Sequence, residues 1–178
     1  MIAYIPGHEP DFWEPDPGVQ SHRFALGRTS MSSAGAPPLI AIGMNPSHAR
    51  ETQADKTVNR IIEASVHHGY AGWIMLNLYP ERSPKPSRLS PFDASLSAMN
   101  CAAIEDVLLR RGTTEVLGAS GNMPHRTLKR AKLDVQALLD RMGVRVFTWD
   151  ALTNKKNPRH PSPPGKRLQM LGPKQYLT

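Results

Sequence analysis

Cysteine and long apolar stretches are what this sequence lacks, and each shortage excludes a class of protein. Cys101 is the only cysteine among 178 residues, so no disulfide can form within the chain. A four-cysteine zinc or iron–sulfur site is excluded for the same reason. No segment approaches the roughly 20 apolar residues that a membrane span needs. The first residues show neither the basic start nor the apolar run of a signal peptide. We therefore expect a cytoplasmic protein that has no membrane partner.

Positive charge is present in excess. Lys and Arg number 22 against 15 Asp and Glu, which gives a formal net charge of +7. DNA suits such a balance as a partner, because neutralising phosphates releases counterions. Charge alone does not identify the partner, since many basic proteins bind no nucleic acid. The length fits one domain, and the 17 prolines indicate that sizeable parts are irregular loop.

Apolar runs alternate with helical periodicities from residue 39 onwards. Residues 1–38 show no sustained periodicity, and we interpret them as an irregular N-terminal arm with one short strand near residues 24–26. Short apolar runs predict buried strands at residues 39–44, 72–78, 115–117 and 144–148. Apolar residues at helical spacing predict helices at residues 58–66, 95–111 and 128–142. This alternation predicts an α/β fold, with one domain at residues 39–178 in three α/β/α layers around a central four-stranded parallel sheet.

Four short polar segments follow the predicted strands or lie in the tail. They are GMNPS at residues 43–47, NLYP at residues 77–80, LGASGN at residues 117–122 and RHPSP at residues 159–163. Each alone has an ordinary explanation, since Asn-Pro favours turns and a proline-rich tail can be a linker. In parallel sheets, however, ligands bind beyond the carboxyl ends of the strands, where the first three segments are expected. We therefore treat the four segments as parts of one site.

In this order the segments resemble motifs of the uracil-DNA glycosylase superfamily, most closely its single-strand-selective monofunctional branch. That branch carries G-M-N-P-G, N-L-C-P and H-P-S-P, and this sequence reads GMNPS, NLYP and HPSP. The chain also resembles an uncharacterised bacterial domain family. Its motifs N-P-S-x-A, D-x-T-x-x-R, G-Y-x-G…N-L and P-R-H-P match residues 45–49, 55–60, 69–78 and 158–161. Together the two resemblances cover about residues 39–165.

The resemblance implies a monofunctional DNA glycosylase that flips a modified pyrimidine out of DNA, excises it and leaves an abasic site. Asn45 matches the residue that holds the attacking water near the sugar C1′. Asn77 matches the amide that reads the base edge, and His160 matches the histidine that bonds the pyrimidine O2 as the base departs. Neither a cofactor nor a metal is implied. We expect the protein to act as a monomer on DNA.

The expected site residues fall into three groups. The catalytic residues are Asn45 and His160. The substrate-binding residues are Gly43, Met44, Pro46, Ser47, His48, Asn77 and Tyr79. The DNA-binding residues are Ser120, Asn122, Arg159, Ser162, Lys166 and Arg167, with the turn at residues 163–166 as a possible wedge that enters the duplex.

Ser47 stands where that branch has a glycine, and strictly uracil-specific members of the superfamily place an aromatic residue in this region. Because serine is small, a larger substituent on the pyrimidine C5 should fit, such as that of hydroxymethylcytosine or its glucosylated form in phage DNA. Uracil and oxidised uracil stay open as substrates. Two other functions also stay open. One is a non-catalytic nucleic-acid or nucleotide-binding module of the same fold, and the other is an enzyme acting on free nucleosides or nucleotides.

Overall fold

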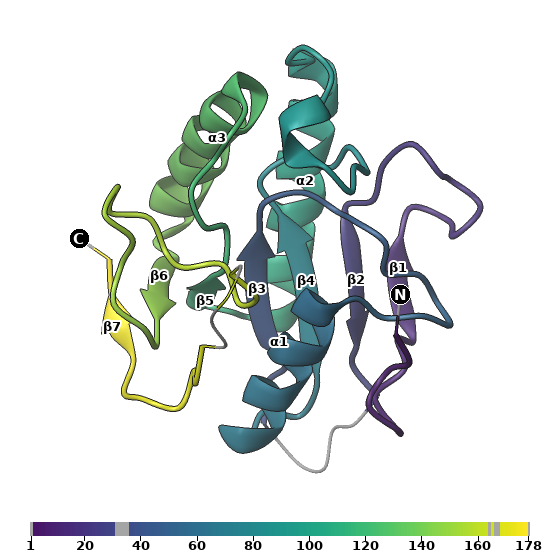
Figure 1. The fold of residues 1–178 in the computed structure, drawn as a ribbon, viewed down its shortest axis with the longest axis vertical. Coiled ribbons are helices and arrows are strands. Elements are labelled where there is room, and N and C mark those ends of the chain that lie inside the picture. Colours follow the sequence, from purple (N-terminus) through teal and green to yellow (C-terminus); the bar gives the residue numbers. More distant parts are fainter. Residues whose placement is uncertain (1, 31–35, 164, 166–167, 178) are drawn as a thin grey trace.

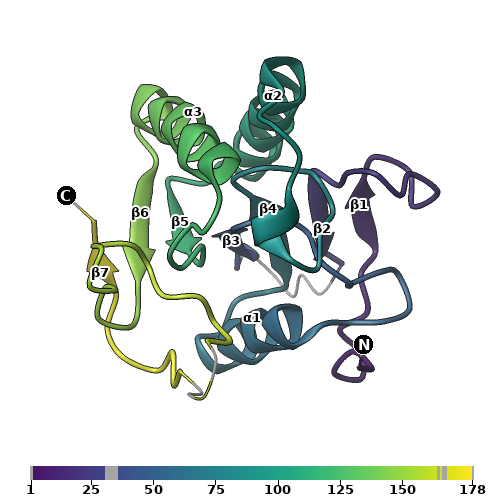
Figure 2. The ribbon, with the colours of Figure 1, turned by 45° about the horizontal axis from the view of Figure 1, so that its top comes forward.

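The computed structural model describes residues 2–30, 36–163, 165 and 168–177. In this part of the chain, seven strands form one mixed sheet with helices on both faces (Figures 1 and 2). The strands are β1 (Phe12–Glu14), β2 (Ala25–Arg28), β3 (Leu39–Gly43), β4 (Trp73–Asn77), β5 (Glu115–Gly118), β6 (Arg145–Thr148) and β7 (Gln175–Tyr176). The helices are α1 (Lys56–His67), the short 3₁₀ helix η1 (Pro86–Arg88), α2 (Ala94–Arg111) and α3 (Arg126–Met142).

The strands lie in the order β1-β2-β4-β3-β5-β6-β7. β3 pairs in parallel with β4 and β5, and β5 pairs in parallel with β6. β1, β2 and β7 add to the two edges in antiparallel orientation. The predicted α/β class is therefore confirmed, but the predicted sheet of four strands is too small. β1 and β7 have three and two residues, which is too short for an apolar pattern to reveal them.

The segment before residue 39 is not only an irregular arm, because it supplies β1 and β2. Ala25 and Leu26 are buried, and the predicted short strand near residues 24–26 corresponds to β2. A Cβ atom at Gly27 would lie 2.5 Å from the carbonyl oxygen of Trp73. The close pairing of β2 with β4 therefore depends on glycine at this position. The pairing holds the residues just before β2 against the carboxyl end of β4, where the backbone N–H of Arg23 donates to the carbonyl of Pro80 (2.9 Å).

Alternation along the central strands divides the core between the two faces of the sheet. Leu39 and Ala41 of β3 pack with the α1 residues Ile61 and Ile62 on one face. Ile40 and Ile42 lie on the other face, with apolar side chains of α2 and α3. Figure 2 shows α1 alone on one side and α2 with α3 on the other. Because both faces are covered, β3 and β4 are apolar up to Gly43 and Asn77 at their ends, as parallel strands in such layers usually are.

Helix α1 begins at a side-chain cap that places a carboxylate near the carboxyl end of β3. Asp55 Oδ1 accepts a hydrogen bond from the backbone N–H of Val58 (2.9 Å). Replacing such a cap by alanine typically costs about 0.5–2 kcal/mol of stability.

No helix in the described part of the chain combines the length and the apolar character that a membrane crossing requires.

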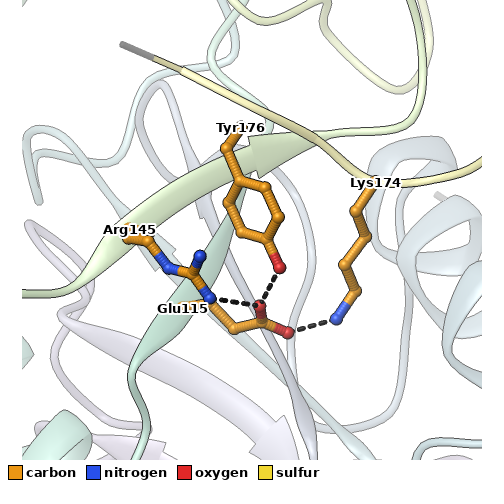
Figure 3. A network of polar contacts seen from close by, with 4 residues as sticks. All are labelled: Glu115, Arg145, Lys174 and Tyr176. Carbon is orange, nitrogen blue, oxygen red and sulfur yellow. Dashed lines mark hydrogen bonds and ion pairs between the residues drawn. The ribbon is translucent and has the colours of Figure 1, made fainter.

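A network of charged and polar side chains holds the last strand on the sheet (Figure 3). The carboxylate of Glu115 accepts hydrogen bonds from Lys174 and from the hydroxyl of Tyr176 (2.6 Å), and a nitrogen of Arg145 lies 3.9 Å from it. Burial favours a higher pKa for Glu115, but the hydrogen bonds and the neighbouring cations outweigh it and lower the pKa. β7 has only two residues, so this network supplies attachment that its backbone pairing alone provides weakly.

Candidate functional site

A cavity of about 440 Å³ opens beyond the carboxyl ends of β3 and β4, next to the first turn of α1. Four stretches of the chain line it, namely residues 44–48, 55–58, 83–86 and 160–162, together with Arg23, Met75 and Asn77. Three of the four polar segments singled out in the sequence therefore meet at one place. This is the position at which ligands bind in open α/β sheets.

Asn77 ends β4 and is only 1% exposed at the wall of the cavity. Its Nδ2 atom is buried and has no hydrogen-bond partner among the described residues. Leaving such a group unsatisfied costs about 1–3 kcal/mol, a cost that a bound ligand would remove. Gly43 is the register neighbour of Asn77 on β3, and a Cβ atom there would lie 3.1 Å from Asn77 Oδ1. Glycine at position 43 therefore keeps the space around this amide free.

The side chain of Asn45 is oriented by carbonyl groups of two loops. Its Nδ2 donates to the carbonyl oxygens of Pro46 (3.0 Å), Glu81 (3.3 Å) and Ser83 (2.9 Å). Carbonyl oxygens only accept, so these contacts assign the nitrogen end of the amide. The Oδ1 atom is left as an acceptor with no partner among the described residues. It can hold a water molecule, and the same side chain ties the loop after β3 to the loop after β4.

His160 is held in a defined tautomer. Its Nδ1 accepts a hydrogen bond from the backbone N–H of Ser162 (3.2 Å), so in the neutral ring the proton is on Nε2. Nε2 lies 3.4 Å from the hydroxyl of Thr57. Burial lowers the pKa of His160, although the negative charge of Asp55 favours the protonated form. The ring is therefore a neutral N–H donor near pH 7.

The segment at residues 117–122 supports His160 from behind and does not line this cavity. A Cβ atom at Gly121 would lie 3.0 Å from Cβ of His160, and the N–H of Gly121 donates to the carbonyl of Pro158 (2.9 Å). At Gly118, an added Cβ would lie 2.5 Å from Cγ of Pro158. The small residues of this segment thus allow the loop that carries His160 to pack closely against the end of β5.

The structure brings together most of the predicted substrate-binding residues, but not Tyr79. Met44, Pro46, Ser47 and His48 line the cavity, and the hydroxyl of Ser47 lies 3.0 Å from Nδ1 of His48.

Tyr79 is buried on the other side, in an apolar cluster with Leu128 and Ala131 of α3. Its hydroxyl accepts a hydrogen bond from the backbone N–H of Asp93 (3.1 Å). The structure therefore does not place Tyr79 at the cavity with the other predicted substrate-binding residues. The motif fixes its position in the chain, but the course of the backbone after β4 turns its side chain towards α3.

The predicted DNA contacts are scattered. Ser162 lines the cavity, and its Oγ atom is buried without a partner among the described residues. Arg159 donates through Nε to the carbonyl of Ala151 (2.8 Å), which gives it a role within its own loop. Lys166 and Arg167, with the expected wedge that continues through Pro164, lie outside the described residues.

Ser120 and Asn122 have structural surroundings. Ser120 lines a different cavity of about 460 Å³, next to α3. Asn122 accepts hydrogen bonds from the hydroxyl of Thr153 (2.7 Å) and from Nδ2 of Asn157 (3.2 Å), and so holds the loop before His160. A DNA contact of Ser120 or Asn122 would therefore lie apart from the cavity that holds Asn77 and His160.

Three charged residues that line the cavity, Arg23, Asp55 and Lys56, were not among the site residues predicted from the sequence. Asp55 begins the D-x-T-x-x-R segment noted in the sequence, and this pattern could have indicated its role. The arginine of the same pattern, Arg60, instead bonds to Glu63 and to the carbonyl of Leu168. Arg23 gave no signal, because it precedes a strand of four residues in a segment without periodicity.

In the described part of the chain, no group of three or more His, Cys, Asp or Glu side chains is arranged to hold a metal ion.

The protein has an α/β fold with a cavity beyond the carboxyl ends of parallel strands, lined in part by polar side chains. A family model described as "Protein of unknown function (DUF1643)" matches residues 23–162, and the chain belongs to this family. The matched range begins at Arg23 and ends at Ser162, both of which line the cavity. No curated protein and no solved structure matches the chain.

Proposed function

We propose that this protein is a monofunctional DNA glycosylase that flips a modified pyrimidine out of DNA and hydrolyses its N-glycosidic bond. One observation carries the proposal: the cavity brings together Asn45, Asn77 and His160, each with a polar atom available to a ligand. The available atoms differ in kind. They are an acceptor on Asn45, an amide nitrogen on Asn77 without a partner among the described residues, and the Nε2–H donor of His160, whose contact with the Thr57 hydroxyl is long at 3.4 Å.

These atoms suit the charges that develop when a glycosidic bond breaks. The electron pair of the C1′–N bond leaves with the base, and negative charge gathers on the base oxygens. The Nε2–H of His160 can donate to that oxygen, and a preorganised donor of this kind is worth about 3–4 kcal/mol in the transition state. A neutral ring serves as the donor, because its proton is needed for a hydrogen bond and not for complete transfer.

Water completes the reaction on the sugar. A water molecule held by Asn45 Oδ1 adds its oxygen to the cationic C1′ and releases one proton, which ends on the departing base. Asp55 is the only carboxylate lining the cavity in the described part of the chain, and it can carry this proton. Its own position is fixed, because Oδ1 caps α1. The reaction then needs no strong base, which an amide could not provide.

The size and the lining of the cavity also indicate which bases the site can accept. A volume of about 440 Å³ lies within the usual range of ligand sites. Ser47 forms part of the wall where a bulky aromatic residue would limit the substituent on C5. We therefore propose that the site accepts 5-substituted pyrimidines, such as hydroxymethylcytosine or its glucosylated form, in addition to uracil. The base must leave the stack first, which selects weakly paired or modified bases.

The test is to incubate the protein with DNAs that carry uracil, hydroxymethylcytosine or glucosylated hydroxymethylcytosine, and to measure abasic sites by alkaline cleavage. Asn45→Ala and His160→Ala should lose abasic sites while they still bind DNA. Asn59→Ala is a matched control, because that amide also bonds to the carbonyl of a distant segment, at Ala3, but does not line the cavity. Undiminished excision in both cavity variants would refute the proposed roles. Salt-sensitive DNA binding without abasic sites on any substrate would favour the alternative, a non-catalytic nucleic-acid-binding module.

A further inference from the structure

Three arginines lie beside the cavity that holds Asn45, Asn77 and His160 (the main cavity). Arg23 Nη1 and Arg82 Nη2 lie 2.6 Å and 3.4 Å from the same acceptor, the carbonyl oxygen of Ala49. A second, smaller cavity of about 70 Å³ is lined by these two arginines and by Arg50. Arg23 lines both cavities, so it lies between the small one and the site that holds Asn77.

The positive charges of this cluster are not neutralised by ion pairs. No ion pair joins Arg23, Arg50 or Arg82 to a carboxylate among the described residues. Arg23 is 6% exposed, and its buried Nε has no hydrogen-bond partner there. A buried charge without a partner is costly, so such an arrangement normally has an anion to complete it.

The pKa shifts of Arg23 and Arg82 also indicate charges that lack an anionic partner. Burial, followed by the charge of Arg82, lowers the pKa of Arg23 to about 10. Burial and the charge of Arg50 lower the pKa of Arg82. Each guanidinium therefore raises the free energy of its neighbour's charged form, and a bound anion would relieve this repulsion.

The acidic groups near the cluster do not replace such an anion. Asp16 and Glu51 also line the small cavity, but neither forms an ion pair with an arginine. Asp16 Oδ1 instead accepts a hydrogen bond from the backbone N–H of Gly18 (2.8 Å). Asp55 favours the charged form of Arg23 through its field, but without an ion pair.

We propose that Arg23, Arg50 and Arg82 bind a phosphate group of the nucleotide whose base enters the main cavity. Guanidinium groups bind phosphate oxygens in paired, charge-assisted hydrogen bonds, and arginine is the usual residue for this task. Arg23 connects the two cavities, because it lines the main cavity with Asn77 and the small cavity with Arg50 and Arg82. The inference deepens the proposed function, since a flipped nucleotide brings its phosphate with it. The phosphate can be a phosphodiester of DNA or the monoester of a free nucleotide.

Inorganic phosphate is the first probe. Thermal unfolding of the full chain is followed in phosphate and in chloride at equal ionic strength. We expect a saturable rise of Tm in phosphate, and an affinity reduced about tenfold or more in Arg82→Gln and in Arg50→Gln. Arg111→Gln is the matched control, since it removes the same charge from an exposed arginine at the end of α2 and should keep the shift. An equal shift in Arg82→Gln, or no saturable shift in the wild type, would overturn the inference.

The second experiment separates the two sources of phosphate. Binding of deoxyuridine, of its 5′- and 3′-monophosphates, and of uracil-containing oligonucleotides is measured. One oligonucleotide carries neutral methylphosphonates on both sides of the uridine. Tighter binding of a monophosphate than of the nucleoside, with the advantage lost in Arg82→Gln, supports the monoester. Weaker binding of the methylphosphonate oligonucleotide, with the difference lost in the same variant, supports the diester. If neither effect is observed, the result contradicts the phosphate site.

Failure of the phosphate site and failure of the proposed function are distinguishable. Arginine-dependent phosphate binding without abasic sites on any DNA would leave the site standing and remove the glycosylase. Excision that is unaffected by Arg82→Gln and by methylphosphonates would support the glycosylase and remove the phosphate site.

Discussion

Two clusters of charged side chains at different places in this molecule are built in opposite ways. At the edge formed by β6 and β7, the single carboxylate of Glu115 faces Lys174, Arg145 and the hydroxyl of Tyr176 (Figure 3). Beside the main cavity, in contrast, guanidinium groups converge on a carbonyl oxygen with no carboxylate in ion-pair contact.

Groups of the first cluster stabilise the fold, and we propose that those of the second bind a ligand. A cluster that pairs opposite charges lowers the free energy of the folded chain by itself. A cluster of like charges, next to an amide without a partner, raises it and is retained where another molecule completes it. Removing groups from the first cluster should therefore reduce stability, and removing groups from the second should reduce binding or catalysis.

The largest effect is expected at His160. His160→Ala removes the Nε2–H donor, and we expect the rate of base excision to fall by about 100- to 1000-fold. Single-turnover measurements of abasic sites on the preferred DNA give this rate, with circular dichroism as a check on folding. A fall of less than tenfold would show that the donor is not used in the transition state.

Asn77→Leu should separate binding from stability. The substitution removes a buried amide nitrogen that has no partner among the described residues and keeps the same branched arrangement of heavy atoms. The larger methyl groups can extend into the adjacent cavity, so the free energy of unfolding should change little. Base recognition should weaken by about tenfold or more, because hydrogen bonds to the base are lost. Denaturant unfolding and the binding of modified DNA measure the two quantities. A large loss of stability with unchanged binding would mean that the amide serves the fold.

Glu115→Gln should show the opposite behaviour, with excision unchanged. We expect a loss of about 1 kcal/mol in the free energy of unfolding near pH 7. The pKa of Glu115 is lowered in the folded chain, so its contribution is present above the pKa of the unfolded chain. It is lost as the pH falls through the lowered pKa of the folded state. The stability difference between wild type and variant should therefore shrink between pH 6 and pH 3, and a constant difference would contradict this.

The smallest effect is expected at Tyr79. Tyr79→Phe removes only the hydroxyl that accepts the N–H of Asp93, so stability should fall by at most about 1.5 kcal/mol. Excision should stay within twofold of the wild type, because the hydroxyl bonds to the backbone of Asp93 and Tyr79 does not line the cavity. Kinetics on the preferred DNA check this. A tenfold loss of activity would return Tyr79 to the substrate site.

Much of the fold could be predicted from local patterns, because the central elements carry their own signals. β3 and β4 are apolar up to the Gly43 and Asn77 that end them, and α1, α2 and α3 each have an apolar side. β1 and β7 carry no such signal, and β2 carries only a short one. They are strands only because a longer neighbour offers hydrogen bonds to them, and that pairing is a tertiary contact.

The candidate site, like the fold, could be predicted only in part from the sequence. Asn45 and Asn77 could be placed together, because each follows a buried strand of the same parallel sheet. His160 entered only through the resemblance of its motif. The inward or outward direction of Tyr79 was not predictable, because it follows the end of its strand, where alternation no longer applies. Arg23 was not predictable either, since it reaches the cavity through the pairing of β2 with β4.

The sequence by itself determined the order of strands and helices and the polar residues at the strand ends, because hydrophobic periodicity and turn-forming residues act over a few neighbouring positions. Only the tertiary structure decided which polar atoms are satisfied and which are free. Hydrogen bonding of Asn45, His160 and Arg23 depends on loops that are distant in the chain and meet only after folding.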